Sequence, residues 1–213
     1  MMAIQPAFND YTAASQTVFR AALTAMSRPA TVREVDFEGL FKDTPPISVT
    51  LAALVMTLAD HLTKVWLSKS LRGASDWLTF HLACPLADLD GDSDNTKIDA
   101  AIIVAANPQE LPKFSALNRG TDRRPDTSAT VMVAEALYSS SLKPNSELSR
   151  WAYGPGLEEP KLFSAPILTK DFLSDWEENF QAYPMGVDVF LTGQNLLAAL
   201  PRSLNLSSQR PSL

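Results

Sequence analysis

The segment Tyr183 to Ser203 reads YPMGVDVFLTGQNLLAALPRS, and its pattern predicts a strand set in an apolar environment. Val187, Val189 and Leu191 alternate with Asp188 and Phe190, and this period of two is that of a β-strand. Pro184 and Gly186, just before this run, favour a turn. Asp188 is the single acid in the run, and burying a carboxylate without a partner is costly. We therefore expect Asp188 to meet a cation.

Upstream of this segment, strand-like and helix-like patterns alternate along the chain. Residues 100–106 and 129–134 are continuous apolar runs, as expected of central strands buried on both faces. Residues 49–61 predict a helix that is apolar on nearly every face, and residues 171–181 predict an amphipathic helix. The other predicted elements are strands over 31–35, 64–67, 77–82 and 148–153 and a helix over 108–117. This alternation indicates an α/β layered fold.

The first predicted helix begins at Asp10, whose side chain is suited to cap it, and ends at Arg28-Pro29. Its apolar residues form a stripe at helical spacing, which predicts the face that packs against the core. The stripe consists of Val18, Phe19, Ala22, Leu23 and Met26.

The composition is that of an ordinary soluble globular protein, with 46% hydrophobic and 20% charged residues. A chain of 213 residues is large enough for one full core and short for two. We expect a single α/β domain over residues 1–206 and a flexible tail over 207–213. The net charge of −6 argues against a surface that neutralises nucleic-acid phosphates.

Three features predict a protein of the cytoplasm. Cys84 is the only cysteine, so an intramolecular disulfide is ruled out and a reducing compartment is indicated. The first nine residues lack the basic start and apolar stretch of a signal peptide. The longest apolar run, residues 51–59, is too short to span a bilayer, so we expect no membrane association.

Residues that often carry catalysis or bind metals are few and scattered. His61, His81 and Cys84 are too few for a structural zinc site. Asp88, Asp90, Asp92 and Asp94 alternate as in a calcium loop, but the closing glutamate is missing. The Gly-x-Ser-x-Gly and phosphate-loop motifs are also absent. We therefore predict no catalytic, cofactor-binding or metal-binding residue.

Two loops remain as candidates for anion binding or for an interface. Arg123 and Arg124, followed by Ser128, precede a central strand, where a planar guanidinium suits a phosphate or a carboxylate. The alternative is a solvated turn in which neighbouring acids neutralise the two arginines. Gly154 and Gly156 flank Pro155 in a loop whose N–H groups either face an anion or simply form a tight turn.

A third constellation is structural. Four charged residues end or interrupt apolar elements, and we expect at least one partly buried Arg–Asp pair among them. They are Arg28, Asp60, Asp188 and Arg202.

Several short motifs, taken in order, resemble the H-subunit family of the carbon-phosphorus lyase system, which degrades phosphonates. Each motif alone is weak evidence for the family, but together the motifs occur in the expected order, and the resemblance extends over residues 8–206. They are Phe19-Arg20-Ala21, Ala25 to Pro29, Leu54 to Asp60, Val65-Trp66-Leu67, Trp77 to His81, Gly120-Thr121 with Ser128 to Thr130, Gly154-Pro155-Gly156, and the segment quoted first. Ala30 departs from the family pattern, which has glycine there, so we expect this turn to avoid a positive φ.

The resemblance implies a three-layer α/β/α sandwich with a mixed sheet, like a reduced large domain of pyridoxal-phosphate-dependent transferases. It also implies that the cofactor has been lost, and none of the eight lysines lies in a recognisable cofactor motif.

The implied role is a non-catalytic, homodimeric subunit of the carbon-phosphorus lyase core complex, with the G, I and J subunits as partners. That complex, with an ATP-binding-cassette-like L subunit, supports the ATP-dependent formation of α-D-ribose 1-methylphosphonate 5-triphosphate. The alternative from the residues alone is a stand-alone enzyme or binding protein for a phosphorylated small molecule, held near Arg123, Arg124 and the 154–156 loop.

Overall fold

A mixed six-stranded sheet forms the centre of the computed structural model, which describes residues 6–87, 97–142 and 148–211. The strand order is β1-β8-β7-β4-β3-β2, and β2, β3, β4 and β7 run parallel while β8 is antiparallel to both of its neighbours. The strands are β1 (Arg33–Glu34), β2 (Val65–Leu67), β3 (Ile102–Ala105), β4 (Thr130–Val133), β7 (Asp188–Gly193) and β8 (Leu196–Leu200). The predicted α/β class and mixed sheet are confirmed, whereas the likeness to pyridoxal-phosphate transferases stays a prediction.

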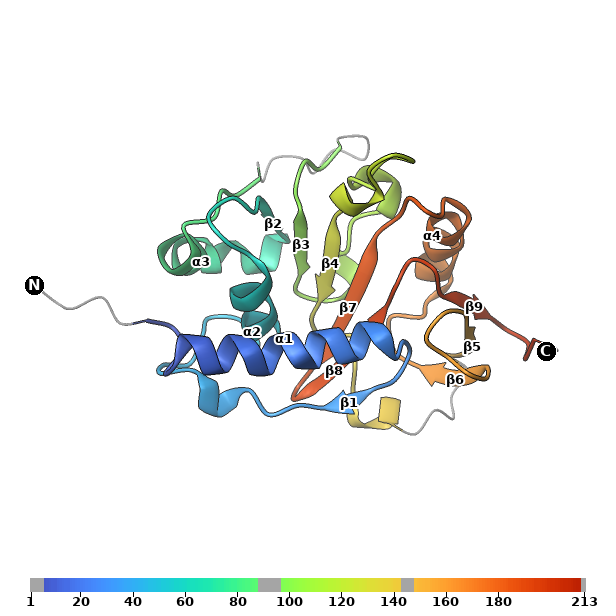
Figure 1. Cartoon of the computed structure of the whole chain (residues 1–213), viewed down its shortest axis with the longest axis horizontal. Helices are drawn as coiled ribbons and strands as arrows, with labels where there is room; N and C mark the ends of the chain where they lie inside the picture. Colours follow the sequence, from blue (N-terminus) through green and yellow to red (C-terminus); the bar gives the residue numbers. More distant parts are fainter. Residues whose placement is uncertain (1–5, 88–96, 143–147, 212–213) are drawn as a thin grey trace, which may run out of the picture.

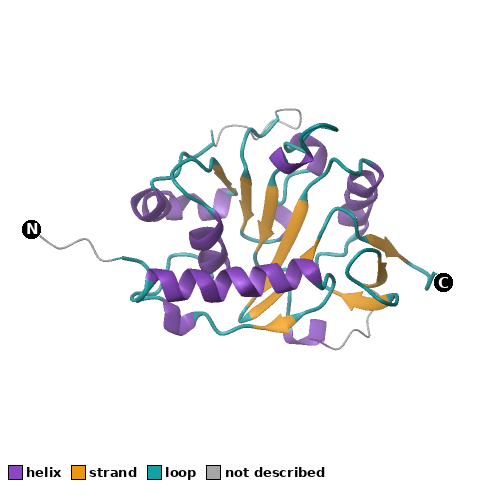
Figure 2. Ribbon diagram, in the orientation of Figure 1, coloured by secondary structure: helices purple, strands orange, loops and turns teal. Residues whose placement is uncertain are grey.

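Helices α1 (Tyr11–Ser27), α2 (Val49–Leu58) and α3 (Ser75–Leu82) pack against one face of this sheet. The opposite face is covered by α4 (Lys170–Gln181) and by a small antiparallel sheet. That small sheet consists of β5 (Ser149–Tyr153), β6 (Lys161–Ser164) and β9 (Asn205–Ser207). Figures 1 and 2 show α1 running across the front of the molecule, with the central strands behind it. Within the described residues, no helix has both the length and the apolar character needed to cross a membrane.

The β7–β8 hairpin shows why the closing segment is so apolar. Its strands are central, so both of their faces are covered. Phe190 and Ala199, which are register partners, belong to the core on the α1 side. Val189 and Leu200, the next pair, belong to the core on the α4 side. Because successive side chains point to opposite faces, a strand between two helical layers needs apolar residues at nearly every position.

Several local predictions are confirmed. The Asp10 carboxylate caps α1 by accepting a hydrogen bond from the N–H of Ala13 at 3.0 Å. Seven consecutive residues of α2, Thr50 to Met56, are buried, as its apolar faces predict. Strand β9 pairs with β5 and extends to Ser207, one residue beyond the predicted domain boundary. Whether the residues after it are flexible stays a prediction.

Two element predictions were wrong. Residues 77–82 form most of helix α3, because Leu78 and Leu82, four residues apart, are the buried side chains of that helix. The helix predicted over 108–117 is instead two short 3₁₀ turns, η3 (Pro108–Glu110) and η4 (Phe114–Ala116). Pro112 lies between them, and proline interrupts a helix because it lacks an N–H donor and clashes with the preceding turn.

The prediction for Ala30 was also wrong. Ala30 has φ +52°, so it adopts the left-handed conformation that glycine would adopt more easily. Its N–H donates to the carbonyl of Ala199 at 3.0 Å, and its side chain is buried. Tertiary contacts therefore hold this residue in the conformation that its type disfavours.

Candidate functional site

Side chains far apart in the sequence meet where the parallel strands β4 and β7 begin. The Arg202 guanidinium binds both oxygens of the Asp188 carboxylate, through Nε at 3.1 Å and Nη2 at 2.5 Å. The Arg202 backbone N–H donates to the same carboxylate at 2.8 Å. The two side chains are 14% and 27% exposed, so the pair is partly buried. Asp188 thus has the cationic partner that its place in an apolar strand demands.

The remaining donors of Arg202 tie this pair to the loop before β4. Its Nη2 donates to the Ser128 hydroxyl at 2.5 Å, and its Nη1 donates to the Pro125 carbonyl at 2.9 Å. With these bonds, all three guanidinium nitrogens are engaged within the chain. The arrangement joins three segments of the structure. Because the guanidinium of Arg202 already binds groups of the chain itself, we interpret Arg202 as a structural residue rather than as a binding site for an incoming anion.

The glycine loop also packs onto this region. A Cβ at Gly156 would lie 2.8 Å from the Ser27 carbonyl oxygen and from the Pro29 ring. A Cβ at Gly154 would lie 2.9 Å from the carbonyl oxygen of Ser203. The loop is therefore pressed against its neighbours. Of the two alternatives, its packing resembles a tight turn more than an open cradle for an anion.

The other predicted residues do not join this cluster. Arg124 binds Asp126 through Nε at 3.0 Å and Nη2 at 2.9 Å, and both side chains are exposed. The hydrogen bond from Arg124 lowers the pKa of the Asp126 carboxyl. Arg123 is exposed as well. Both arginines are therefore solvated, and Arg124 is neutralised by Asp126 as in the alternative interpretation of the sequence.

Arg28 and Asp60 do not form an Arg–Asp pair with each other or with Asp188 and Arg202 in the described part of the chain. Arg28 is exposed and ends helix α1, with its N–H on the Thr24 carbonyl. Asp60 accepts hydrogen bonds from the Thr63 hydroxyl and from the N–H of Leu62. The bond from Thr63 is the largest cause of a lowered Asp60 pKa. Asp60 therefore stabilises a local turn.

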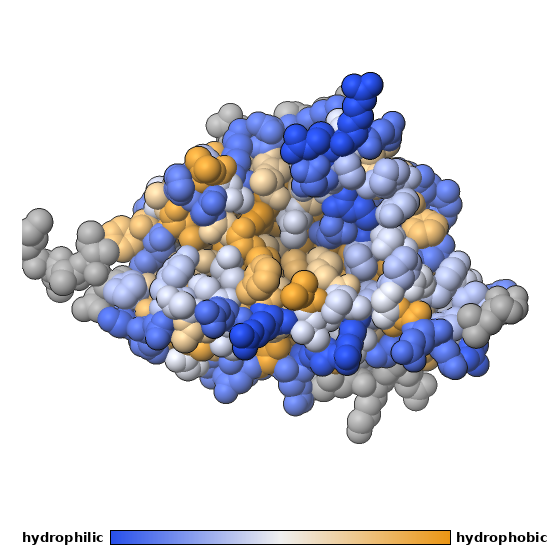
Figure 3. Space-filling model, viewed as in Figure 1, coloured by the Kyte–Doolittle hydropathy of each residue, from blue (hydrophilic) through white to orange (hydrophobic). Residues whose placement is uncertain are grey.

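An apolar hollow of about 450 Å³ adjoins the Asp188–Arg202 pair, between α1 and the starts of the central strands. Figure 3 shows apolar surface gathered there, above α1 in this view. The hollow is lined by Phe19, Ala22, Leu23, Met26, Leu58, Thr63, Ala101, Ile102, Ser128, Thr130, Asp188 and Phe190. Phe19 and Leu23 are 52% and 58% exposed, which is unusual for large apolar side chains beside a sheet.

The exposure of Phe19 and Leu23 corrects the prediction that the whole α1 stripe faces the core. Only Val18 and Ala22 of that stripe are buried, with Met26 partly so. The sequence did carry a signal: Val18-Phe19 and Ala22-Leu23 are adjacent pairs, which make the stripe wider than one packed face. The excess width marks a second apolar face, and that face borders the hollow.

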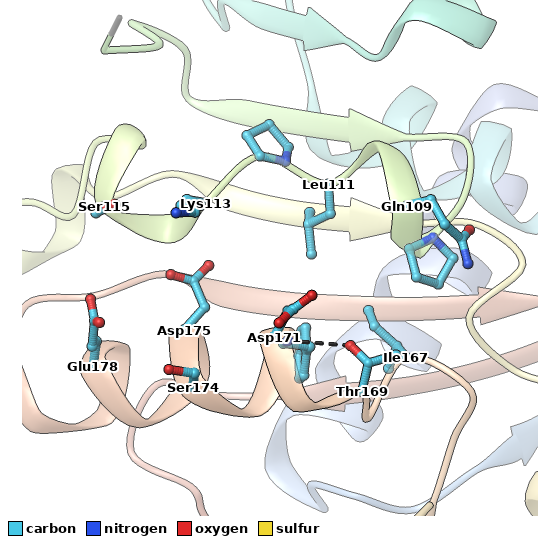
Figure 4. A pocket seen from close by; sticks show the side chains of 13 residues that line it. Gln109, Leu111, Lys113, Ser115, Ile167, Thr169, Asp171, Ser174, Asp175 and Glu178 are labelled. Carbon is cyan, nitrogen blue, oxygen red and sulfur yellow. Dashed lines mark hydrogen bonds between the residues drawn. The ribbon is translucent and has the colours of Figure 1, made fainter. Parts of the chain in front are cut away.

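A larger cavity, of about 900 Å³, lies between α4 and residues 108–115. Figure 4 shows Asp171, Asp175 and Glu178 along the α4 side, with Lys113 and Leu111 on the opposite side. Asp175 accepts a hydrogen bond from the N–H of Phe114 at 2.7 Å, and burial raises its pKa. In the described ranges, no group of three or more His, Cys, Asp or Glu side chains is arranged to hold a metal.

Cys84 and His81 line neither cavity. Cys84 is buried, and desolvation raises the pKa of its thiol, which disfavours the reactive thiolate. Burial lowers the pKa of His81, whose ring packs against Trp77 and Phe80 in α3. The predicted calcium-like run, Asp88 to Asp94, lies outside the described residues.

Comparison with known proteins identifies relatives of the whole chain. A family model described as bacterial phosphonate metabolism protein (PhnH) matches residues 6–207. A curated protein of Rhizobium meliloti (strain 1021) is 28% identical over 206 residues, which cover 95% of each chain. That protein is named alpha-D-ribose 1-methylphosphonate 5-triphosphate synthase subunit PhnH.

Proposed function

Because this chain belongs to the bacterial phosphonate metabolism family PhnH, as its motifs suggested, we propose that it is a subunit of an α-D-ribose 1-methylphosphonate 5-triphosphate synthase. Its task in that assembly is docking, and the docking surface is the apolar hollow beside α1. The exposure of Phe19 and Leu23 carries this proposal. Water covers these side chains in the isolated chain, and burying them against another subunit is favourable.

The hollow has the anatomy of a protein interface. Its α1 side offers two large apolar side chains, Phe19 and Leu23, which are suited to be central anchors. Hydroxyl groups of Thr63, Ser128 and Thr130 lie among its lining residues. An apolar centre with nearby polar groups is the usual composition of a specific interface.

The proposed role is non-catalytic. The saturated hydrogen bonding of Arg202 and the disfavoured thiolate of Cys84 support this reading. In the assembly, the subunit supports the ATP-dependent transfer that forms the ribose triphosphate product. From the family resemblance we further propose a homodimer in the cytoplasm, with the G, I and J subunits as partners. A companion subunit, rather than the second copy of this chain, covers the hollow.

Leu23→Asp is expected to abolish co-purification with the companion subunits, since it places a charge in the centre of the apolar surface. The side chain is 58% exposed, so the thermal unfolding midpoint of the isolated chain should change little. The experiment is co-expression of all subunits with one tagged companion, followed by gel filtration of the captured complex.

Phe80→Asp is the matched control, because Phe80 is 56% exposed but lies on α3 and does not line the hollow. It should leave the complex intact. Complex formation by Leu23→Asp at wild-type yield would rule out the hollow as the docking surface. If the isolated wild-type chain is a dimer and the isolated Leu23→Asp chain is a monomer, the hollow is instead the surface through which two copies of this chain associate.

A further inference from the structure

Two cations that form no ion pair with an acid in the described part of the chain lie near β1, the edge strand of the large sheet. Arg33 belongs to the edge strand β1, where it pairs with Leu197 of β8. Lys161 is the first residue of β6. The Lys161 ammonium donates to the Thr31 hydroxyl at 2.9 Å, which ties β6 to the segment that leads into β1. Figure 1 shows β1 below α1 and β6 at the lower right, beyond the end of that helix, and the apolar surface of the hollow lies above α1 in Figure 3.

Arg33 is half-buried, and its Nε is shielded from water and has no hydrogen-bond partner among the residues that the structure describes. Arg202, by contrast, uses all its guanidinium nitrogens in bonds within the chain. A guanidinium carries five N–H donors, and shielding even one of them from water without an acceptor is costly. Because protein atoms cover Nε, an anion would reach Arg33 only through its terminal nitrogens, Nη1 and Nη2, which are not among the shielded atoms that lack a partner.

Lys161 is an exposed residue, whereas Arg33 is half-buried, but the two are close enough for the charge of Arg33 to act on Lys161. The pKa of Lys161 is lowered, first by desolvation and then by the positive charge of Arg33. Neither side chain forms an ion pair with an acid in residues 6–87, 97–142 and 148–211. The nearby Glu159 lies 3.9 Å from Arg210 instead. The Lys161 ammonium, held on Thr31, is therefore near enough to Arg33 for the two positive charges to repel each other, in a chain whose net charge is −6.

We propose that Arg33 and Lys161 form a binding site for a phosphate group. The planar fork of an arginine matches the oxygens of a phosphate, and a lysine beside it adds a second, mobile donor. A phosphate monoester carries about −1.5 to −2 charges at neutral pH, so it neutralises both cations, whereas a single carboxylate neutralises one. The ligand class is a phosphorylated small molecule, bound away from the exposed pair Arg123 and Arg124.

The test is a titration of the isolated, isotope-labelled chain with inorganic phosphate, followed by amide NMR. We expect saturable shifts confined to the amides of residues 31–34 and 161–162. Arg33→Gln and Lys161→Gln should each weaken phosphate binding at least about tenfold, the loss expected for one hydrogen bond to a charged group. Sodium acetate at the same ionic strength should produce no saturable shift.

Lys69→Gln is the control variant, since Lys69 is exposed next to β2, at the opposite edge of the sheet, and its replacement changes the net charge equally. It should leave the phosphate affinity within about twofold, as expected for a distant charge screened by salt. Equal weakening by Lys69→Gln would show nonspecific attraction and overturn the site. Saturable acetate binding at the same residues would show a carboxylate site, such as one for an acidic residue of a partner. Because the isolated chain is used, the result is independent of the docking proposal, and Lys161→Gln suffices if Arg33→Gln fails to fold.

Discussion

Arg202→Met should lower the free energy of unfolding by about 3–5 kcal/mol, because it leaves the Asp188 carboxylate in a partly buried position without its cation. The loss extends beyond the ion pair. Arg202 also donates to Ser128 and Pro125, so three segments lose their common anchor. Chemical denaturation of the isolated chain, followed by tryptophan fluorescence, measures the change.

A double-mutant cycle separates the pair from its surroundings. Asp188→Asn should also destabilise the fold, and the double variant should lose less than the sum of the two single losses. Strictly additive losses would refute the coupling between Asp188 and Arg202. The exposed Arg124–Asp126 pair serves as the comparison, and Asp126→Asn should have a far smaller effect because water screens that pair.

Gly193→Ala is expected to destabilise the fold by more than about 3 kcal/mol, through steric overlap in the core. A Cβ at Gly193 would lie 2.2 Å from the carbonyl oxygen of Leu137, a backbone atom that cannot turn aside. The Thr192 carbonyl accepts the N–H of Ala136 beside it, and the Thr192 hydroxyl donates to the carbonyl of Val133. These bonds hold the two segments at their close approach.

Gly39→Ala is the control for this substitution, because no atom lies within 4 Å of the position of its added Cβ. Its unfolding free energy should stay within about 0.5 kcal/mol of the wild type. Thermal and denaturant unfolding of both variants provide the comparison. A Gly193→Ala chain as stable as Gly39→Ala would mean that residues 134–138 adapt freely, which contradicts the tight join between β4 and β7.

Much of the fold followed from local patterns. The apolar runs at 100–106 and 129–134 predicted central strands, and β3 and β4 lie there with both faces covered. The amphipathic pattern at 171–181 predicted α4. Residues 77–82 were misassigned because aromatic and β-branched residues suit a strand. Their helix depends on burying Leu78 and Leu82 together, which is a tertiary contact.

The candidate sites were harder to predict from the sequence than the fold was. The pattern around Asp188 called for a cation, but Arg28 and Arg202 were equal candidates until the fold placed only Arg202 beside it. Arg123 and Arg124 looked suited to an anion, yet Asp126 lies near enough to neutralise Arg124. Arg33 and Lys161 are 128 positions apart, and no local signal connects residues at that separation.

The sequence by itself determined most of the strands and helices, which of the predicted strands are central, and that one acid within an apolar strand needs a partner. These properties depend on the spacing of side chains along the chain, and that spacing can be read directly from the sequence. Only the tertiary structure decided which arginine meets Asp188, that Phe19 and Leu23 stay exposed, and that Lys161 lies near Arg33. These properties depend on which distant segments are brought together, because burial and Coulomb interactions act through space rather than along the chain.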